Sequence, residues 1–330
     1  MSEVQGFDGV DEVLERDPRA QRVLRSADGR LVVQARAKLN LGLRVFPVRA
    51  DGFHDIESWM VPISWHDTLF VSGEGGAGGG LELVVTGRSQ GVPVELEKNL
   101  VGRAALALAK AGGIAARGRI ELHKVLPPGG GLGGGSSDAA NALVALNEAW
   151  GLGMSEEKLI QIAAGLGSDV PFFVNGRPSL CTGRGEVMTV LRNAHPLFAV
   201  LIISPGGCPT GEVYKAFDQG HAAPTRRGEA ERWSGDTWCR YAASSAEELS
   251  AILMNDLEAA ALHVAPWLQA VKEKAFVAAG GGRALHMTGS GSTLFALCGS
   301  GAEAGELQGL WAKALGPDYG VVAVKVLRQR

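Results

Sequence analysis

The chain has 330 residues, enough for about two domains at roughly 100 to 200 residues each, so a single small module is excluded. Hydrophobic residues make up 46% of the chain and charged residues 20%, which excludes an intrinsically disordered protein. The formal net charge of −3 provides no basic surface for nucleic acid or an anionic membrane, so small molecules are the expected partners. The unusual feature is glycine, with 47 residues, about twice its average share.

The cysteines and the N-terminal residues favour a cytoplasmic protein. The four cysteines contain no Cys-x-x-Cys pair, so neither a zinc site nor a disulfide framework is indicated. Residues 1–29 are polar and charged, which excludes the apolar core of a secretion signal. No apolar stretch approaches the roughly 18 residues that a membrane helix needs. We therefore expect no membrane and no nucleic-acid partner.

In chain order, a polar N-terminal extension (1–29) precedes a region rich in predicted strands. Alternation of apolar and polar residues predicts the first of these strands, and a turn follows it at residues 49–52. A glycine run at 73–80 is expected to be a flexible hairpin loop, since no helix follows it directly. The predicted strands of this region are 32–46, 56–63, 68–71 and 81–86.

Helical periodicity begins at Asn99, and a composition break near His195 separates two regions of mixed helices and strands. We therefore expect an N-terminal domain over 30–195 and a C-terminal domain over 196–330, the latter with a polar insert at 218–250. The predicted helices are 99–112, 138–150, a helix capped by Ser155, 251–262, 267–279 and 302–315. The remaining predicted strands are 119–126, 197–203, 284–288, 293–297 and 321–327.

The glycine-rich segment 127–137 connects a predicted strand directly to a predicted helix. This succession presents backbone N–H groups to a phosphate at a helix N-terminus. Gly129, Gly131 and Gly134 also match G-x-G-x-x-G, but Glu148 lies inside a helix and not at the end of a second strand, which disfavours a dinucleotide site. No Gly-Lys-Ser/Thr follows the glycines, so the segment is not a Walker loop.

This glycine loop and four further segments resemble the GHMP kinases, the family of galactokinase, homoserine kinase and mevalonate kinase. Within that family they resemble the branch whose acceptor is 4-diphosphocytidyl-2-C-methyl-D-erythritol. The matching segments, in the family's order, are residues 37–41, 49–54, 127–139, 167–172 and 288–292.

The resemblance implies an α+β, two-domain GHMP kinase fold, with a ribosomal-protein-S5-domain-2-like ATP-binding domain followed by a ferredoxin-like domain. It also implies transfer of the γ-phosphoryl group of ATP, with Mg²⁺, to the 2-hydroxyl of that acceptor. This reaction belongs to the non-mevalonate (methylerythritol phosphate) isoprenoid pathway. We expect a monomer or a homodimer.

Two charged residues match the family's catalytic pair. Asp169 matches the aspartate that accepts the hydroxyl proton, and Lys38 matches the lysine that keeps it ionised and neutralises developing charge. Lys38 also lies on an otherwise apolar predicted strand, where a charge is costly unless it is paired or functional.

The resemblance assigns the ATP phosphates to the glycine loop and the adenine to an asparagine. Asn99 is equally well explained as the N-cap of the following helix. Ser136 or Ser137 is the expected Mg²⁺ contact, and no magnesium carboxylate is identified. The expected ATP-binding residues are Pro128, Gly129, Gly130, Gly131, Leu132, Gly133, Gly134, Gly135, Ser136, Ser137 and Asn99.

The acceptor site is expected to hold the cytosine ring between Phe53 and Tyr214, with His54 hydrogen-bonded to the cytosine edge. Phe53 stands where the family usually has tyrosine, so stacking is retained but a phenol hydrogen bond is lost. Asn40 is expected near the erythritol hydroxyls. Gly289 and Gly291 either approach the phosphates or form only a tight strand connection. The expected substrate-binding residues are Asn40, Phe53, His54, Thr210, Tyr214, Gly289 and Ser290.

Two alternatives remain open at this point. Another GHMP kinase, acting on mevalonate or homoserine, would have no cytosine to bind with His54 and its aromatic neighbours. A non-catalytic nucleotide or sugar sensor would have no need of both Lys38 and Asp169.

Overall fold

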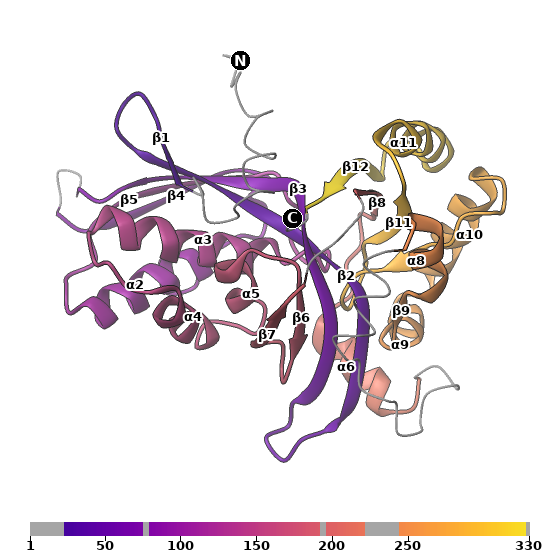
Figure 1. The fold of residues 1–330 in the computed structure, drawn as a ribbon, viewed down its shortest axis with the longest axis horizontal. Coiled ribbons are helices and arrows are strands. Elements are labelled where there is room, and N and C mark those ends of the chain that lie inside the picture. Colours follow the sequence, from indigo (N-terminus) through magenta and orange to yellow (C-terminus); the bar gives the residue numbers. More distant parts are fainter. Residues whose placement is uncertain (1–22, 75–78, 192–195, 222–243, 328–330) are drawn as a thin grey trace.

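The structure, a computed structural model, describes residues 23–74, 79–191, 196–221 and 244–327. The strands of these residues form one twelve-stranded sheet whose main path runs β1-β2-β3-β12-β8-β11-β10. Helices α2 to α5 cover the part of the sheet built by the first half of the chain, and α8 to α11 gather around the part built by the second half (Figure 1). None of the helices in these described ranges is long and apolar enough to cross a membrane.

The long antiparallel pair of β2 (Leu31–Val48) and β3 (His54–Ser72) is the centre of the sheet. The predicted division of β3 into strands 56–63 and 68–71 is wrong, because β2 continues to pair across the polar residues between them, as in Arg36 with His66. Register shifts flank Lys38 on β2, and such irregularities locally bend a strand.

On the outer side of β3, β5 (Gly118–Lys124) pairs antiparallel with β3, and β4 (Leu81–Gly87) pairs parallel with β5. The glycine run 73–80 therefore does not close a hairpin, because β5 lies between the two strands that it connects. Residues 75–78 of this run lie outside the described residues. β1 (Val23–Arg25), which pairs with β2, comes from the last part of the predicted N-terminal extension.

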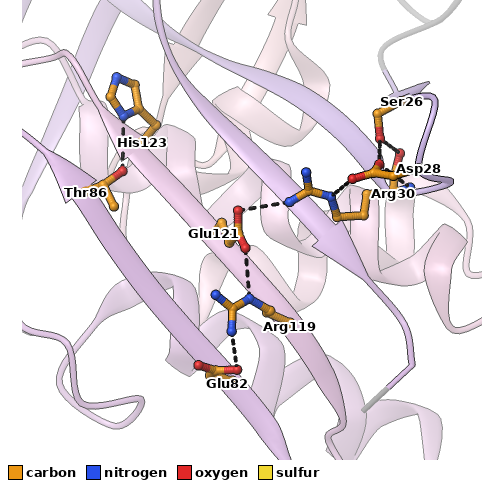
Figure 2. A network of polar contacts seen from close by, with 8 residues as sticks. All are labelled: Ser26, Asp28, Arg30, Glu82, Thr86, Arg119, Glu121 and His123. Atoms are coloured by element: carbon orange, nitrogen blue, oxygen red, sulfur yellow. Dashed lines mark hydrogen bonds and ion pairs between the residues drawn. The ribbon is translucent and has the colours of Figure 1, made fainter. Parts of the chain in front are cut away.

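A row of charged side chains covers the face of these strands that points away from helices α2 and α3 (Figure 2). Arg119 donates hydrogen bonds to Glu82 (2.6 Å) and Glu121 (2.8 Å). Arg30 bridges Glu121 (2.9 Å) and Asp28 (2.7 Å). These pairs are partly exposed, so each adds little stability. They explain the polar half of the alternating pattern and leave the other face for the helices.

The helices α2 (Leu100–Gly112) and α3 (Gly134–Ala149) pack on that other face. Asn99 caps α2 by accepting a hydrogen bond from the N–H of Val101 at 2.8 Å, as predicted. Helix α3 begins four residues earlier than predicted, so the last residues of the glycine loop form its first turn. The remaining elements of this half are α4 (Glu156–Ala164), α5 (Val170–Asn175), β6 (Ser179–Thr182) and β7 (Val187–Val190).

In the second half, β8 (Leu197–Ile203) lies between β11 (Leu294–Cys298) and β12 (Gly320–Val326), and β10 (His286–Met287) pairs with β11. A single bridge, Val326 with Ile63, joins β12 to β3. Apolar residues of β8 and β11 pack against α9 (Glu258–Val264), α10 (Trp267–Ala278) and α11 (Gly301–Leu315).

The predicted helix 251–262 is wrong. It divides into α8 (Ala246–Ile252), β9 (Met254–Asn255) and α9. The Asn255 side chain accepts a hydrogen bond from the N–H of Leu257 at 3.0 Å, and β9 pairs in parallel with β2. Of the predicted polar insert, residues 222–243 lie outside the described residues, while α6 (Thr210–Asp218) ends where the insert begins.

Candidate active site

A cavity of about 540 Å³ lies where the glycine loop, β2, the start of α5 and the turn at residues 288–292 meet, a size typical of small-molecule sites. It brings together residues that are far apart in the sequence. Of the predicted site residues, it is lined by Lys38, Asn40, Asn99, Pro128, Gly129, Gly130, Gly131, Leu132, Gly133, Gly134, Gly135, Ser136, Asp169, Thr210, Tyr214, Gly289 and Ser290. Ser137, Phe53 and His54 do not line it.

Two glycines of the loop are required by close packing. Gly131 has φ +74°, and a Cβ there would lie 2.5 Å from the carbonyl oxygen of Thr288. Gly133 has φ +71°, and its Cβ would lie 2.7 Å from the ring of Phe173. Both features exclude an ordinary L side chain. The glycine loop is thereby fixed against the 288–292 turn on one side and α5 on the other.

Lys38 and Asp169 form an ion pair in this cavity. The distance from Lys38 Nζ to Asp169 Oδ2 is 3.7 Å, with the lysine side chain 4% exposed and the aspartate 37%. Asp169 occupies the N-cap position of α5 but makes no capping hydrogen bond. Its carboxylate is therefore not used to cap the helix. Burial lowers the pKa of Lys38, and the nearby Asp169 and Cys181 partly oppose that effect.

Asn40 contacts Lys38 directly. Its Oδ1 accepts hydrogen bonds from Lys38 Nζ and from the Thr288 hydroxyl, and its Nδ2 donates to Ser58 Oγ at 2.7 Å. The predicted place of Asn40 near the erythritol hydroxyls stays a prediction.

Below the glycine loop lies a buried charged cluster that the sequence reasoning missed. Lys124 Nζ binds Asp138 Oδ2 at 2.7 Å and also binds Asp67, while Asp67 Oδ1 accepts from the N–H of Leu126 at 2.8 Å. Burial, which outweighs the attraction of Lys124, raises the pKa of Asp138 to about 8. The signal was present, because Lys124 falls in the same two-residue register as the buried Ile120 and Leu122 of β5.

The two serines that follow the glycines differ in their surroundings. The Ser137 hydroxyl is buried, donates to the Arg36 carbonyl at 2.7 Å and accepts from Asn141 Nδ2 at 3.3 Å. That hydroxyl is therefore committed to holding α3 on β2. Ser136 lines the cavity and is the serine available to a phosphate or a metal ion.

The residues predicted for the cytosine lie at the far end of β2 and β3. His54 is 8% exposed, its Nδ1 is 2.7 Å from the Phe46 carbonyl, and its Nε2 is 3.3 Å from Asp218 Oδ1. Its ring centroid lies 5.3 Å from that of Tyr214, so these two predicted residues are neighbours. Phe53 is 50% exposed, and the Arg184 guanidinium lies 4.6 Å from its ring centroid.

The turn at 288–292 is anchored from two sides. Asn255 Nδ2 donates to the carbonyls of Met287 and Gly289, at 2.8 Å each. The hydroxyls of Ser290 and Thr210 lie 2.8 Å apart, which joins the turn to the start of α6. The second half of the chain therefore completes a cavity whose charged groups come from the first half.

Comparison with known proteins agrees with this architecture. Residues 99–177 match the family model described as the GHMP kinases N terminal domain. A 4-diphosphocytidyl-2-C-methyl-D-erythritol kinase from Salinispora tropica is 40% identical over 85% of this chain and 87% of its own length. One from Pelotomaculum thermopropionicum is 42% identical over 80% and 87%.

A crystal structure of 4-(cytidine 5'-diphospho)-2C-methyl-D-erythritol kinase superposes with a TM-score of 0.68 at 31% identity, covering 89% of this chain and 98% of that one. The predicted α+β GHMP kinase fold is confirmed. The chain belongs to the 4-diphosphocytidyl-2-C-methyl-D-erythritol kinase family of the GHMP kinases.

Proposed function

We propose that the protein transfers the γ-phosphoryl group of ATP to the 2-hydroxyl of 4-diphosphocytidyl-2-C-methyl-D-erythritol, giving the 2-phosphate and ADP. This reaction is a step in the supply of isoprenoid precursors. The observation that carries the proposal is the Lys38–Asp169 pair, at 3.7 Å, in the same cavity as the glycine loop.

The chemistry assigned to the pair is that of a base and its counter-charge. The acceptor 2-hydroxyl gives its proton to Asp169 while its oxygen forms a bond to the γ-phosphorus and the bond from that phosphorus to the β-phosphate oxygen breaks. The Lys38 ammonium pairs with Asp169 and neutralises charge on the transferring group. The partial exposure of Asp169 leaves this carboxylate open to the acceptor.

The glycine loop and the first turn of α3 are the proposed site of the ATP phosphates. Residues 129–135 line the cavity, and helix α3 starts at Gly134, so its unpaired N–H groups and its dipole favour an anion there. We place the adenine near Asn99, which also lines the cavity.

Division of the chain into domains 30–195 and 196–330 stays a prediction.

The GHMP family implies a magnesium ion with ATP, and the residues at the start of α3 fit one. Asp138 Oδ1 is buried and has no hydrogen-bond partner among the described residues. Ser136 and Asp138 are the residues that would hold the ion, which when bound screens the phosphate charges.

For the acceptor, we place the cytosine end beside Tyr214, His54 and Phe53. Tyr214 lines the cavity and stands next to His54. Stacking of the pyrimidine on Phe53 requires Arg184 to share or leave that ring.

Coupled ADP release with a panel of alcohols tests the proposal. Purified protein with ATP and Mg²⁺ should release ADP with 4-diphosphocytidyl-2-C-methyl-D-erythritol and not with mevalonate or homoserine. Turnover of mevalonate alone would overturn the assigned acceptor. Nucleotide binding without turnover of any acceptor would favour a sensor.

A further inference from the structure

A chain of buried hydrogen bonds joins the 288–292 turn to the Lys38 ammonium. Thr288 Oγ1 accepts from the Asn40 N–H at 3.0 Å and donates to Asn40 Oδ1 at 3.2 Å. Asn40 Oδ1 in turn accepts from Lys38 Nζ. The Thr288 side chain is therefore linked to the Lys38 ammonium through one intervening side chain, that of Asn40.

The orientation of the Asn40 amide is determined by its partners. Two donors, Lys38 Nζ and the Thr288 hydroxyl, require the oxygen on their side. On the other side Ser58 Oγ accepts from Asn40 Nδ2 and donates to the Gly42 carbonyl at 3.0 Å. Thr288 and Ser58 are fully buried and Asn40 is 7% exposed, so water does not replace a lost partner without rearrangement.

Asn40, and not Asp169, makes the short contact with the Lys38 ammonium. The Nζ to Asp169 distance of 3.7 Å exceeds the roughly 2.7 to 3.2 Å of an N–H···O hydrogen bond. A lysine side chain has four rotatable bonds, so an ion pair at this distance does not by itself fix the ammonium position. The hydrogen bond from Nζ to Asn40 Oδ1 supplies that restraint.

Thr288 belongs to the second half of the chain and is held there independently of Lys38. Asn255 binds the carbonyls on both sides of Thr288, those of Met287 and Gly289. The Thr288 carbonyl also packs against Gly131 of the glycine loop. One residue thus contacts the phosphate loop through its backbone and the catalytic lysine's partner through its side chain.

We propose that Thr288 is a positioning residue for phosphoryl transfer, which through Asn40 holds the Lys38 ammonium beside Asp169. The inference rests on the proposed function. It goes beyond that function because the position of Lys38, in the first half of the chain, then depends on the side chain of Thr288 in the second half. Thr288 itself does not line the cavity, so it acts only through Asn40.

The test is the variant Thr288→Val, which keeps the side-chain shape and removes the hydroxyl. We expect kcat to fall by about 10²-fold, the size of loss that follows about 1 Å of misplacement, while KM for ATP changes by less than about threefold. Thr288→Ser, which keeps the hydroxyl, should restore most of kcat. Thr189→Val is the matched control, since Thr189 is exposed on β7.

A pH profile separates positioning from general damage. The basic limb of the pH profile is expected to follow loss of the proton from Lys38. Burial lowers the pKa of Lys38, while Asp169 and Cys181 raise it. The hydrogen bond from Nζ to Asn40 Oδ1 also favours the charged form of the lysine. Loss of the ordered Asn40 amide should therefore move the basic limb of the kcat profile of Thr288→Val to lower pH. An unchanged limb, or an unchanged kcat, would overturn the proposal.

A crystal structure of Thr288→Val tests the positioning role without relying on which alcohol is the acceptor substrate. If the wild-type protein turns over none of the panel, the proposed function fails, but the Lys38–Asp169 distance in the variant still decides the positioning role. Displacement of Nζ from Asp169 supports the role. Retention of the 3.7 Å separation and of the Asn40 contact contradicts it.

Discussion

Lys124 and Asp138 form a buried ion pair at 2.7 Å directly beside the glycine loop, on side chains that are 4% and 3% exposed. The pair connects β5 to the N-terminal part of α3. Because Asp67 binds the same ammonium, one lysine joins three elements around the proposed phosphate site.

Replacement of that lysine should destabilise the fold. Lys124→Met leaves two buried carboxylates without their cation, and we expect a loss of about 3 to 5 kcal/mol in the free energy of unfolding. Asp138→Asn should cost less, because the amide oxygen still accepts from Lys124 and because Asp138, with its pKa raised to about 8, carries little charge near neutral pH. Urea titrations of both variants measure the difference, and equal losses would contradict this account of the cluster.

Removal of the proposed base should abolish turnover and spare nucleotide binding. For Asp169→Asn we expect kcat to fall by about 10² to 10⁴-fold, the contribution of a general base. Because the proposed phosphate site is made of backbone N–H groups of the glycine loop and not of this carboxylate, calorimetric affinity for a non-hydrolysable ATP analogue should change by less than about threefold. Turnover that survives the substitution would remove Asp169 from its role.

A methyl group at Gly131 should disturb the glycine loop. The Cβ of Gly131→Ala would lie 2.5 Å from the Thr288 carbonyl, on a backbone with φ +74°, so we expect KM for ATP to rise at least about tenfold, or about 1.4 kcal/mol. Gly309→Ala on α11 is the matched control, because its Cβ would meet no atom within 4 Å. That control should leave KM unchanged and raise helix stability slightly. A normal KM for Gly131→Ala would show that the loop tolerates displacement.

Stability should depend on pH through His286. Burial, aided by Lys272, lowers the pKa of His286 from 6.5 to about 4, so the unfolded chain binds a proton that the folded chain rejects. The free energy of unfolding should therefore fall as pH drops from about 6.5 to about 4, by up to about 3 kcal/mol from this group. Unfolding titrations of His286→Gln across this range should show a shallower slope, and an unchanged slope would assign the effect elsewhere.

Features that depend on residues close together in the sequence could be predicted from it. Motifs of a few residues placed Lys38, Asp169 and the glycine loop, and the cavity brings all of these together. The cap at Asn99 and the strand Leu197–Ile203 were predicted as well, because local side-chain chemistry and periodicity determine them.

Features that depend on distant partners were missed. Polar residues near Asp67 indicated a break in β3, yet the Asp67 carboxylate is satisfied by Lys124 and by backbone N–H groups of the segment after β5. Pairing of β9 with β2 interrupted the predicted helix 251–262. The use of Asn40 as the partner of Lys38 depends on Thr288, a residue 248 positions away.

The position of β12 also bears on how the molecule is made. This strand is the last described in the chain, yet it lies between β3 and β8 in the sheet. During synthesis from the N-terminus, the helical layer over β2, β3 and β5 has all its residues long before β12 leaves the ribosome, since domains emerge and fold in order. The link from β3 to β8, β11 and β10 therefore waits for the final strand. A nascent chain stalled before residue 320 would carry both catalytic charges while, of the described strands, only the short β9 pairs the second half with the first.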